Sequence, residues 1–127
     1  LGPWPCYVGI TTCEKAFATE MKRLKISDVN FLGQTTAGAT THIFANHNSL
    51  CFIITILPFN ARKQSREQYI ALVAHEAMHV IQEMRKELAQ GESLGDEAEA
   101  YLIQQIVQEA GQFIFRTNKV RRTEPTP

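Results

Sequence analysis

The sequence predicts a single α+β domain, and three observations lead to this class. The chain has 127 residues, the size of one ordinary domain. Its hydrophobic fraction of 44% and charged fraction of 20% are typical of chains that fold around an apolar core. Segments rich in β-branched and aromatic residues lie between segments with helical periodicity. We expect one domain over residues 1–118 and a flexible tail over residues 119–127.

The first regular element expected is an amphipathic helix. The Gly- and Pro-rich N-terminus predicts irregular structure, with Trp4 and Tyr7 as anchors onto the core. From Thr12 to about Leu24, apolar residues recur at three- and four-residue spacings, and charged residues take the other side. The turn-rich stretch that follows predicts a loop that includes a short strand around Val29–Leu32.

A β-hairpin and two further helices complete the expected order. The segments TTHIFAN and LCFIITIL are separated by Asn and His residues that tolerate turn geometry, which predicts a hairpin over residues 40–57. Capping-box signatures at Ser65–Gln68 and Ser93–Asp96 open the two helices. The first is expected over Arg66–Leu88, and the second is expected to end at about Phe115.

Charge and apolar runs exclude some classes of partner. Thirteen Lys and Arg residues balance thirteen Asp and Glu residues, so no overall field attracts nucleic acid or an anionic membrane. The longest strongly apolar run, residues 50–57, is far shorter than the roughly 20 residues that span a bilayer as a helix. No signal peptide is visible in the N-terminal residues. We therefore expect no membrane partner and no nucleic-acid partner.

Cysteine usage points to a reducing compartment. Cys6, Cys13 and Cys51 are odd in number and include no CxxC pair, which argues against a disulfide framework and a cysteine-based zinc ribbon. We expect free thiols and a cytoplasmic protein.

The segment HEAMH, residues 75–79, carries the strongest chemical signal in the chain. On a helix, residues i and i+4 share one face, so His75 and His79 can offer imidazole nitrogens to one metal ion. Glu76 is turned away from that pair by about 100° but stays near the water that an open zinc site would hold, so it can act as a general base. The segment therefore fits the HExxH pattern of a catalytic zinc site.

The alternative is a solvated or structural histidine pair. HEAMH lies among apolar residues, where an unpaired imidazole carries a desolvation cost that a metal would relieve. A helix with acidic residues follows after a short connection, and the preceding hairpin can offer a strand edge to an extended substrate. These features favour the Zn²⁺ site. The hairpin histidines, His42 and His47, are not expected to be catalytic, although His42 can face the cleft.

A catalytic zinc needs a third protein ligand and one open position, and the next helix offers acidic candidates. Glu97 is favoured, since Glu97 and Ala100 form an E-x-x-A step whose small residue lets two helices approach closely. Glu99 points about 200° away on the same helix and is the second candidate, followed by Asp96 or water. Tyr101 lies four residues after Glu97 and is a candidate for oxyanion stabilisation, the alternative being an aromatic that packs between helices.

These motifs resemble those of a known family. HEAMH with an acidic residue on the next helix is similar to zincin metallopeptidases of the gluzincin type. The combination LVAHEAMHVIQEMR and GDEAEAYLIQQI resembles small HExxH proteins of tailed phages and prophages, and EKAFATEMKRL and the hairpin also fit. No HxxGxxH extension follows, which separates the chain from metzincins, and the large lobes of gluzincins are missing.

The resemblance implies a minimal zincin-like domain. His75, His79 and Glu97 would be the Zn²⁺ ligands and Glu76 the catalytic base. The predicted function is hydrolysis of a peptide bond in a peptide or protein substrate, in the cytoplasm of the host cell if the chain is phage-encoded. The alternative is a catalytically inactive zincin-fold binding module that engages a host or virion protein.

Overall fold

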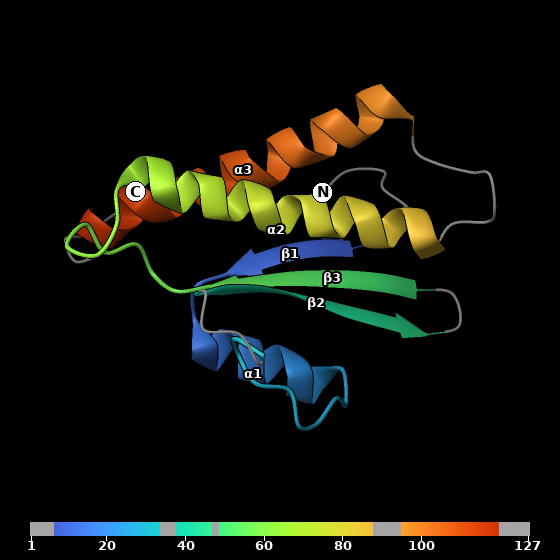
Figure 1. Cartoon of the computed structure of the whole chain (residues 1–127). Coiled ribbons are helices and arrows are strands. Elements are labelled where there is room, and N and C mark those ends of the chain that lie inside the picture. The colour runs from blue at the N-terminus through green and yellow to red at the C-terminus, as the bar shows by residue number, and fades with distance from the viewer. Residues whose placement is uncertain (1–6, 34–37, 47–48, 88–94, 120–127) are drawn as a thin grey trace.

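The polypeptide forms three layers, with a β-sheet between helices on its two faces (Figure 1). The computed structural model describes residues 7–33, 38–46, 49–87 and 95–119. Within these ranges the elements follow in the order β1 (Tyr7–Thr11), α1 (Glu14–Arg23), β2 (Ala39–Asn46), β3 (Ser49–Ile56), α2 (Arg66–Glu87) and α3 (Asp96–Lys119). The predicted α+β class is confirmed. None of the described helices has the length and apolarity needed to cross a membrane.

The sheet has the strand order β1-β3-β2, so β3 is central and β2 forms one edge. β2 and β3 pair antiparallel, with Thr41 opposite Ile54 and Ile43 opposite Phe52. This pairing confirms the predicted hairpin. β1 pairs with β3 in parallel, with Val8 opposite Phe52.

β1 contradicts the prediction of irregular structure before α1. This strand has five residues and includes Gly9, so its local β signal is weak, and it is held by pairing with a strand far along the chain. Val8 is buried in the core, whereas Tyr7 is 58% exposed. Tyr7 is therefore not a core anchor, and Trp4 lies outside the described residues.

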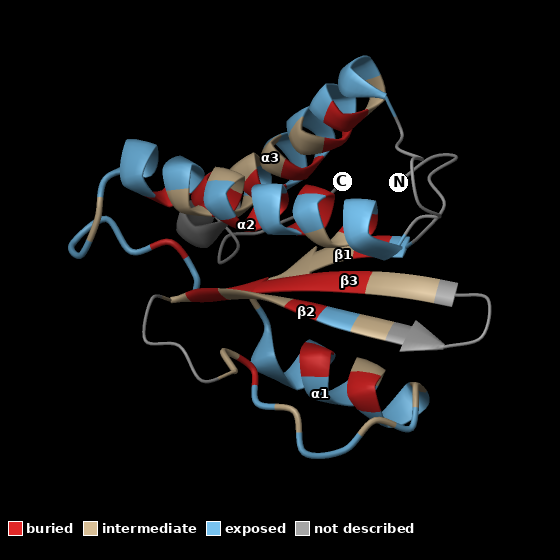
Figure 2. Cartoon of the chain, turned by 45° about the vertical axis from the view of Figure 1, so that its right-hand side comes forward, coloured by how far each residue is buried: buried red, intermediate tan, exposed pale blue. Residues whose placement is uncertain are grey.

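One face of the sheet packs against α2 and α3 (Figure 2). Alternate residues of β3, Phe52, Ile54 and Ile56, have no exposed surface. They share one apolar cluster with Val8 of β1 and with residues of the two helices: Tyr69, Val73, Ala77, Val80, Ile81, Met84, Leu102, Ile106, Ala110 and Ile114. Full burial of a large side chain of this kind stabilises the fold by about 1.5–3 kcal/mol, so this cluster fixes α2 on the sheet.

The opposite face of the sheet packs against α1 and the loop that follows it. Phe17, Met21, Phe31 and Ile53 form this second, smaller cluster. The predicted strand around Val29–Leu32 is wrong, because this segment is irregular. The carbonyl of Phe31 in this loop accepts hydrogen bonds from side chains of the sheet instead of pairing with a strand.

The start of α2 agrees with its sequence signal. The Ser65 hydroxyl accepts a hydrogen bond from the backbone N–H of Gln68 at 3.0 Å, and the Gln68 side chain accepts one from the backbone N–H of Ser65 at 2.8 Å. This capping box opens α2 as predicted. The partner predicted for the α3 box, Ser93, lies outside the described residues, and α3 continues past the predicted end at Phe115.

Two cysteines are described, and both are free thiols as expected. Cys13 and Cys51 are not in disulfides, and Cys6 lies outside the described residues. Cys13 also caps α1, because its sulfur accepts a hydrogen bond from the backbone N–H of Ala16 at 3.3 Å.

Candidate metal site

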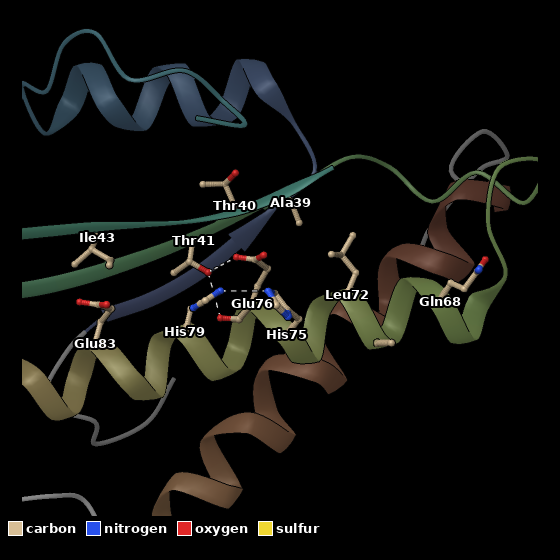
Figure 3. Close-up of a pocket in the computed structure, with 11 residues that line it drawn as sticks. Ala39, Thr40, Thr41, Ile43, Gln68, Leu72, His75, Glu76, His79 and Glu83 are labelled. Carbon is tan, nitrogen blue, oxygen red and sulfur yellow. Dashed lines mark hydrogen bonds between the residues drawn. The ribbon is translucent and has the colours of Figure 1, made fainter. Parts of the chain in front are cut away.

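Two imidazoles meet on the face of α2 that looks toward β2 (Figure 3). The Nε2 atoms of His75 and His79 lie 3.2 Å apart, and their rings stand edge to face with centroids 4.8 Å apart. Together with the carboxylate of Glu76, the two rings form a group whose ligand atoms all lie within 4.8 Å of one another. The helix thus gathers the three functional groups of HExxH at one place.

The packing of α2 explains why these rings face the edge strand. Val73, Ala77 and Val80 are buried against the sheet and α3, which fixes the rotation of the helix about its axis. The Tyr69 hydroxyl donates a hydrogen bond to the carbonyl of Leu57 at 2.9 Å and so attaches the first turns of α2 to the end of β3. Burial raises the pKa of Tyr69 to about 12, so this hydroxyl remains a donor at neutral pH.

The separation of the two imidazole nitrogens fits a shared metal ion. Two nitrogens bound to tetrahedral zinc at roughly 2.0–2.1 Å lie about 3.3 Å from each other. The observed distance between Nε2 of His75 and Nε2 of His79 is 3.2 Å. The donor set of two imidazoles is also one that zinc prefers. The pair therefore meets the geometric and chemical requirements for two of the ligands of a zinc ion.

Glu76 is held in place by the edge strand. Its side chain points between α2 and β2, the residue is 6% exposed, and its Oε1 accepts a hydrogen bond from the hydroxyl of Thr41 at 2.7 Å. The same hydroxyl lies 3.2 Å from the backbone carbonyl oxygen of Glu76. A buried carboxylate requires such a partner, and one bonded oxygen leaves the other available to a water molecule.

A groove of about 750 Å³ runs between α2 and β2 beside this group. Its walls come from one face of α2, at three- and four-residue spacings, and from the first half of β2: Ala39, Thr40, Thr41, Ile43, Gln68, Ala71, Leu72, His75, Glu76, His79 and Glu83. Figure 3 shows the labelled residues of this wall, with His75, His79 and Glu83 projecting from α2 toward the strand. The candidate metal ligands therefore line a groove that a substrate or ligand can enter.

The structure does not bring the predicted third ligand to the histidines. Glu97 is exposed in the first turn of α3, and neither Glu97, Glu99 nor Asp96 belongs to the group of ligand atoms around His75 and His79. Figure 1 shows that α3 begins near the C-terminal end of α2 and runs back in the opposite direction. Glu97 as a zinc ligand stays a prediction from the sequence, without support from this geometry.

Glu99 has a different partner. Its carboxylate accepts two hydrogen bonds from the guanidinium of Arg85, at 2.6 and 3.1 Å, and Arg85 holds the pKa of Glu99 below its usual range. Arg85 lies six residues beyond His79, which is about 9 Å farther along the helix axis. The pair therefore connects α3 to the end of α2 and leaves Glu99 away from the histidines.

Tyr101 also lies apart from the histidines. Its side chain is 54% exposed and is not among the residues that line the groove. The predicted spacing from Glu97 does place both residues on one face of α3, but that face is exposed, whereas Leu102 and Ile106 face the core. A role for Tyr101 in oxyanion stabilisation has no support from its position.

His42 lies on the other face of the sheet. It is 8% exposed, and its Nε2 donates a hydrogen bond to the carbonyl of Phe31 at 2.9 Å. Its ring packs against Phe17, with centroids 4.7 Å apart. His42 is therefore a structural residue of the α1 side, and His47 lies outside the described residues.

Two residues of the groove, Thr41 and Glu83, are not among the site residues predicted from the sequence. Thr41 is separated from Glu76 by 35 residues, so their hydrogen bond depends on how β2 packs on α2. Glu83 lies one helical turn after His79, and this i+4 spacing could have placed it on the histidine face.

No family model, curated protein or solved structure matches this chain.

Proposed function

We propose that the protein is a zinc-dependent peptidase of the HExxH type, with His75 and His79 as metal ligands and Glu76 as general base. The observation that carries this proposal is the convergence of the two Nε2 atoms, 3.2 Å apart, beside a buried carboxylate in an open groove. Burying the Glu76 carboxylate costs desolvation free energy that an apolar side chain at the same position would not cost. This cost favours a functional role for Glu76 over a purely structural one.

A zinc ion at the two imidazoles would polarise a peptide carbonyl and increase the acidity of a water molecule. Glu76 would accept a proton from the attacking water while Thr41 holds one carboxylate oxygen. It would then deliver that proton to the amide nitrogen as the carbon–nitrogen bond breaks. The oxygen of the water forms the new bond to the carbonyl carbon, and the electron pair of the broken carbon–nitrogen bond stays on the nitrogen. The products are a carboxylic acid and an amine, and transfer of the remaining water proton from the acid to the amine gives a carboxylate and an ammonium group.

The sheet offers a place for the substrate backbone. β2 is the edge strand beside α2, and it pairs with β3 on its other side. An edge strand carries free N–H and C=O groups that an extended peptide can pair with, as in other cases of strand addition. A peptide added to β2 would cross the groove in front of His75 and His79.

A second candidate is a binding module that keeps the fold without catalysis. This alternative is favoured by the position of Glu97, since the described residues supply two imidazoles and Glu76 but no further acidic ligand at the group. Catalytic zinc sites in proteins use three protein ligands. A module of this kind would hold a peptide in the same groove and release it unchanged.

The test compares metal content and turnover in three proteins: the wild type, Glu76→Gln, and the double variant His75→Ala/His79→Ala. We expect one zinc per chain in the wild type and Glu76→Gln, none in the double variant, and cleavage of an unfolded protein by the wild type only. Zinc bound without any cleavage by the wild type would support the binding module. Equal zinc content in all three proteins would overturn the metal site itself.

A further inference from the structure

The groove has two chemically different ends. Beside Ala39, Ala71 and Leu72 its wall is mainly apolar and ends at the polar side chain of Gln68, whereas beyond His79 the wall contains Ile43 and the carboxylate of Glu83 (Figure 3). The wall includes two carboxylates, Glu76 and Glu83, and none of the residues that line it is Lys or Arg. A bound molecule therefore meets mainly small and aliphatic side chains at one end and, at the other, the carboxylate of Glu83, whose partner Lys86 does not line the groove.

Glu83 is available to a ligand. Its side chain is 29% exposed and contacts Lys86 on the same helix at 3.0 Å, while Lys86 itself is 69% exposed. Exposed i,i+3 pairs of this kind contribute little, because both side chains keep much of their contact with water. A cation on a bound peptide can therefore replace Lys86 as the partner of Glu83.

The direction of β2 relates these ends to the two sides of the cleaved bond. β2 runs from Ala39, beside Leu72, to Ile43, beside Glu83 (Figure 3). Antiparallel pairing is the more stable arrangement per residue, and a peptide paired in this way with β2 runs opposite to it, so the N-terminal part of the peptide would lie along Ile43 and Glu83. Its C-terminal part would lie along Leu72 and Ala71.

From this arrangement we propose that Glu83 selects substrates with a Lys or Arg side chain on the N-terminal side of the cleaved bond and an apolar residue after it. This inference rests on the proposed peptidase function for the position of the bond. The recognition itself needs only the groove and the carboxylate. The substrate class is therefore an extended segment of a basic peptide or an unfolded basic protein.

The test measures binding separately from cleavage. Three peptides differ at a single position, with Arg, Gln or Glu directly before a Leu, and each is titrated in the presence of zinc onto the full chain carrying Glu76→Gln. We expect the Arg peptide to bind about three- to fivefold more tightly than the Gln peptide, the range of an exposed charge pair. The Glu peptide should bind more weakly than both, and added salt should reduce these differences.

Matched variants assign the preference to one carboxylate. Adding Glu83→Gln should remove the difference between the Arg and Gln peptides, and Glu83→Lys should reverse the order of the Arg and Glu peptides. Glu67→Gln, an exposed carboxylate in the first turn of the same helix and outside the groove wall, makes the same change in net charge and should leave the preference intact.

Equal binding of the three peptides, no binding at millimolar concentration, or an unchanged preference after Glu83→Gln would overturn this subsite. Cleavage of the same peptides by the wild-type protein tests the proposed peptidase function separately. Turnover that does not distinguish the three peptides leaves the peptidase in place and removes the subsite. A charge preference in binding without turnover keeps the subsite and removes the peptidase.

Discussion

The hydroxyl of Thr41, on the edge strand, donates a hydrogen bond to the Glu76 carboxylate on α2 at 2.7 Å. This contact joins the sheet to the proposed general base, and it directs one carboxylate oxygen toward β2 while the other stays free. Because Glu76 is 6% exposed, its orientation depends on this partner more than on bulk water. Thr41 is therefore a positioning residue for the proposed reaction.

Thr41→Val tests this role, because it keeps the shape of the side chain and removes the donor. We expect kcat to fall about 10-fold, the lower end of the range for groups that orient residues at metal sites, with little change in zinc affinity. Thr41→Ser, which restores the hydroxyl, should recover most of the rate. If Thr41→Val lowers activity and zinc content together, or if Thr41→Ser does not recover the rate, the residue supports folding and does not orient Glu76.

The position of Glu97 gives a second prediction. Since Glu97 lies outside the group around the histidines, Glu97→Gln should leave the zinc dissociation constant within about twofold of wild type, whereas His79→Ala should weaken binding strongly. Competition with a chromogenic chelator measures both constants. A loss of 10-fold or more in Glu97→Gln would show that α3 contributes a ligand, as the sequence predicts.

The sequence predicts the parts of this fold that depend on local patterns. The capping box at Ser65–Gln68 opens α2, and the alternation in the hairpin identifies β2 and β3. HExxH identifies a group that converges because i and i+4 share a helical face, so its geometry is local as well.

Contacts between distant segments decide the features that local sequence patterns do not predict. β1 is a short strand that depends on pairing with β3, and periodicity over five residues cannot reveal this. The place of Glu97 depends on how α3 is set against α2, which the Arg85–Glu99 pair and the packing of Leu102 decide. Helical spacing predicts which residues share a face of α3 with Glu97. It does not predict whether that face turns toward α2 or toward solvent.

Buried His42 predicts a pH dependence of stability. Desolvation lowers its pKa below the usual 6.5, although its hydrogen bond to Phe31 opposes the shift. As the pH falls below about 6.5, the unfolded chain binds a proton at this residue that the folded chain resists. The free energy of unfolding should therefore decrease, with a slope of at most about 1.4 kcal/mol per pH unit from this one group.

Urea denaturation at about pH 7.5 and about pH 5.5 checks this expectation. His42→Gln keeps a donor for the Phe31 carbonyl but does not titrate, so it should lose less stability over this interval than the wild type. An identical loss in both proteins would show that other groups cause the acid sensitivity.

The ion pair between Arg85 and Glu99 helps to hold α3 against α2, so exchanging the two charged residues should change the stability of the fold. Glu99 is buried, with a side chain 8% exposed, so its charge depends on the guanidinium at 2.6 Å. Arg85→Glu and Glu99→Arg should each lower the midpoint of thermal unfolding, and the double variant should recover part of the loss.

The same pair predicts a pH dependence. Since Arg85 lowers the pKa of Glu99, the stabilisation of the fold by this ion pair is present at neutral pH and is lost as the pH falls through the folded-state pKa of the Glu99 carboxyl. The penalty of Arg85→Glu should thus shrink in acid. Additive losses in the double variant, or a penalty independent of pH, would mean that apolar packing alone positions α3.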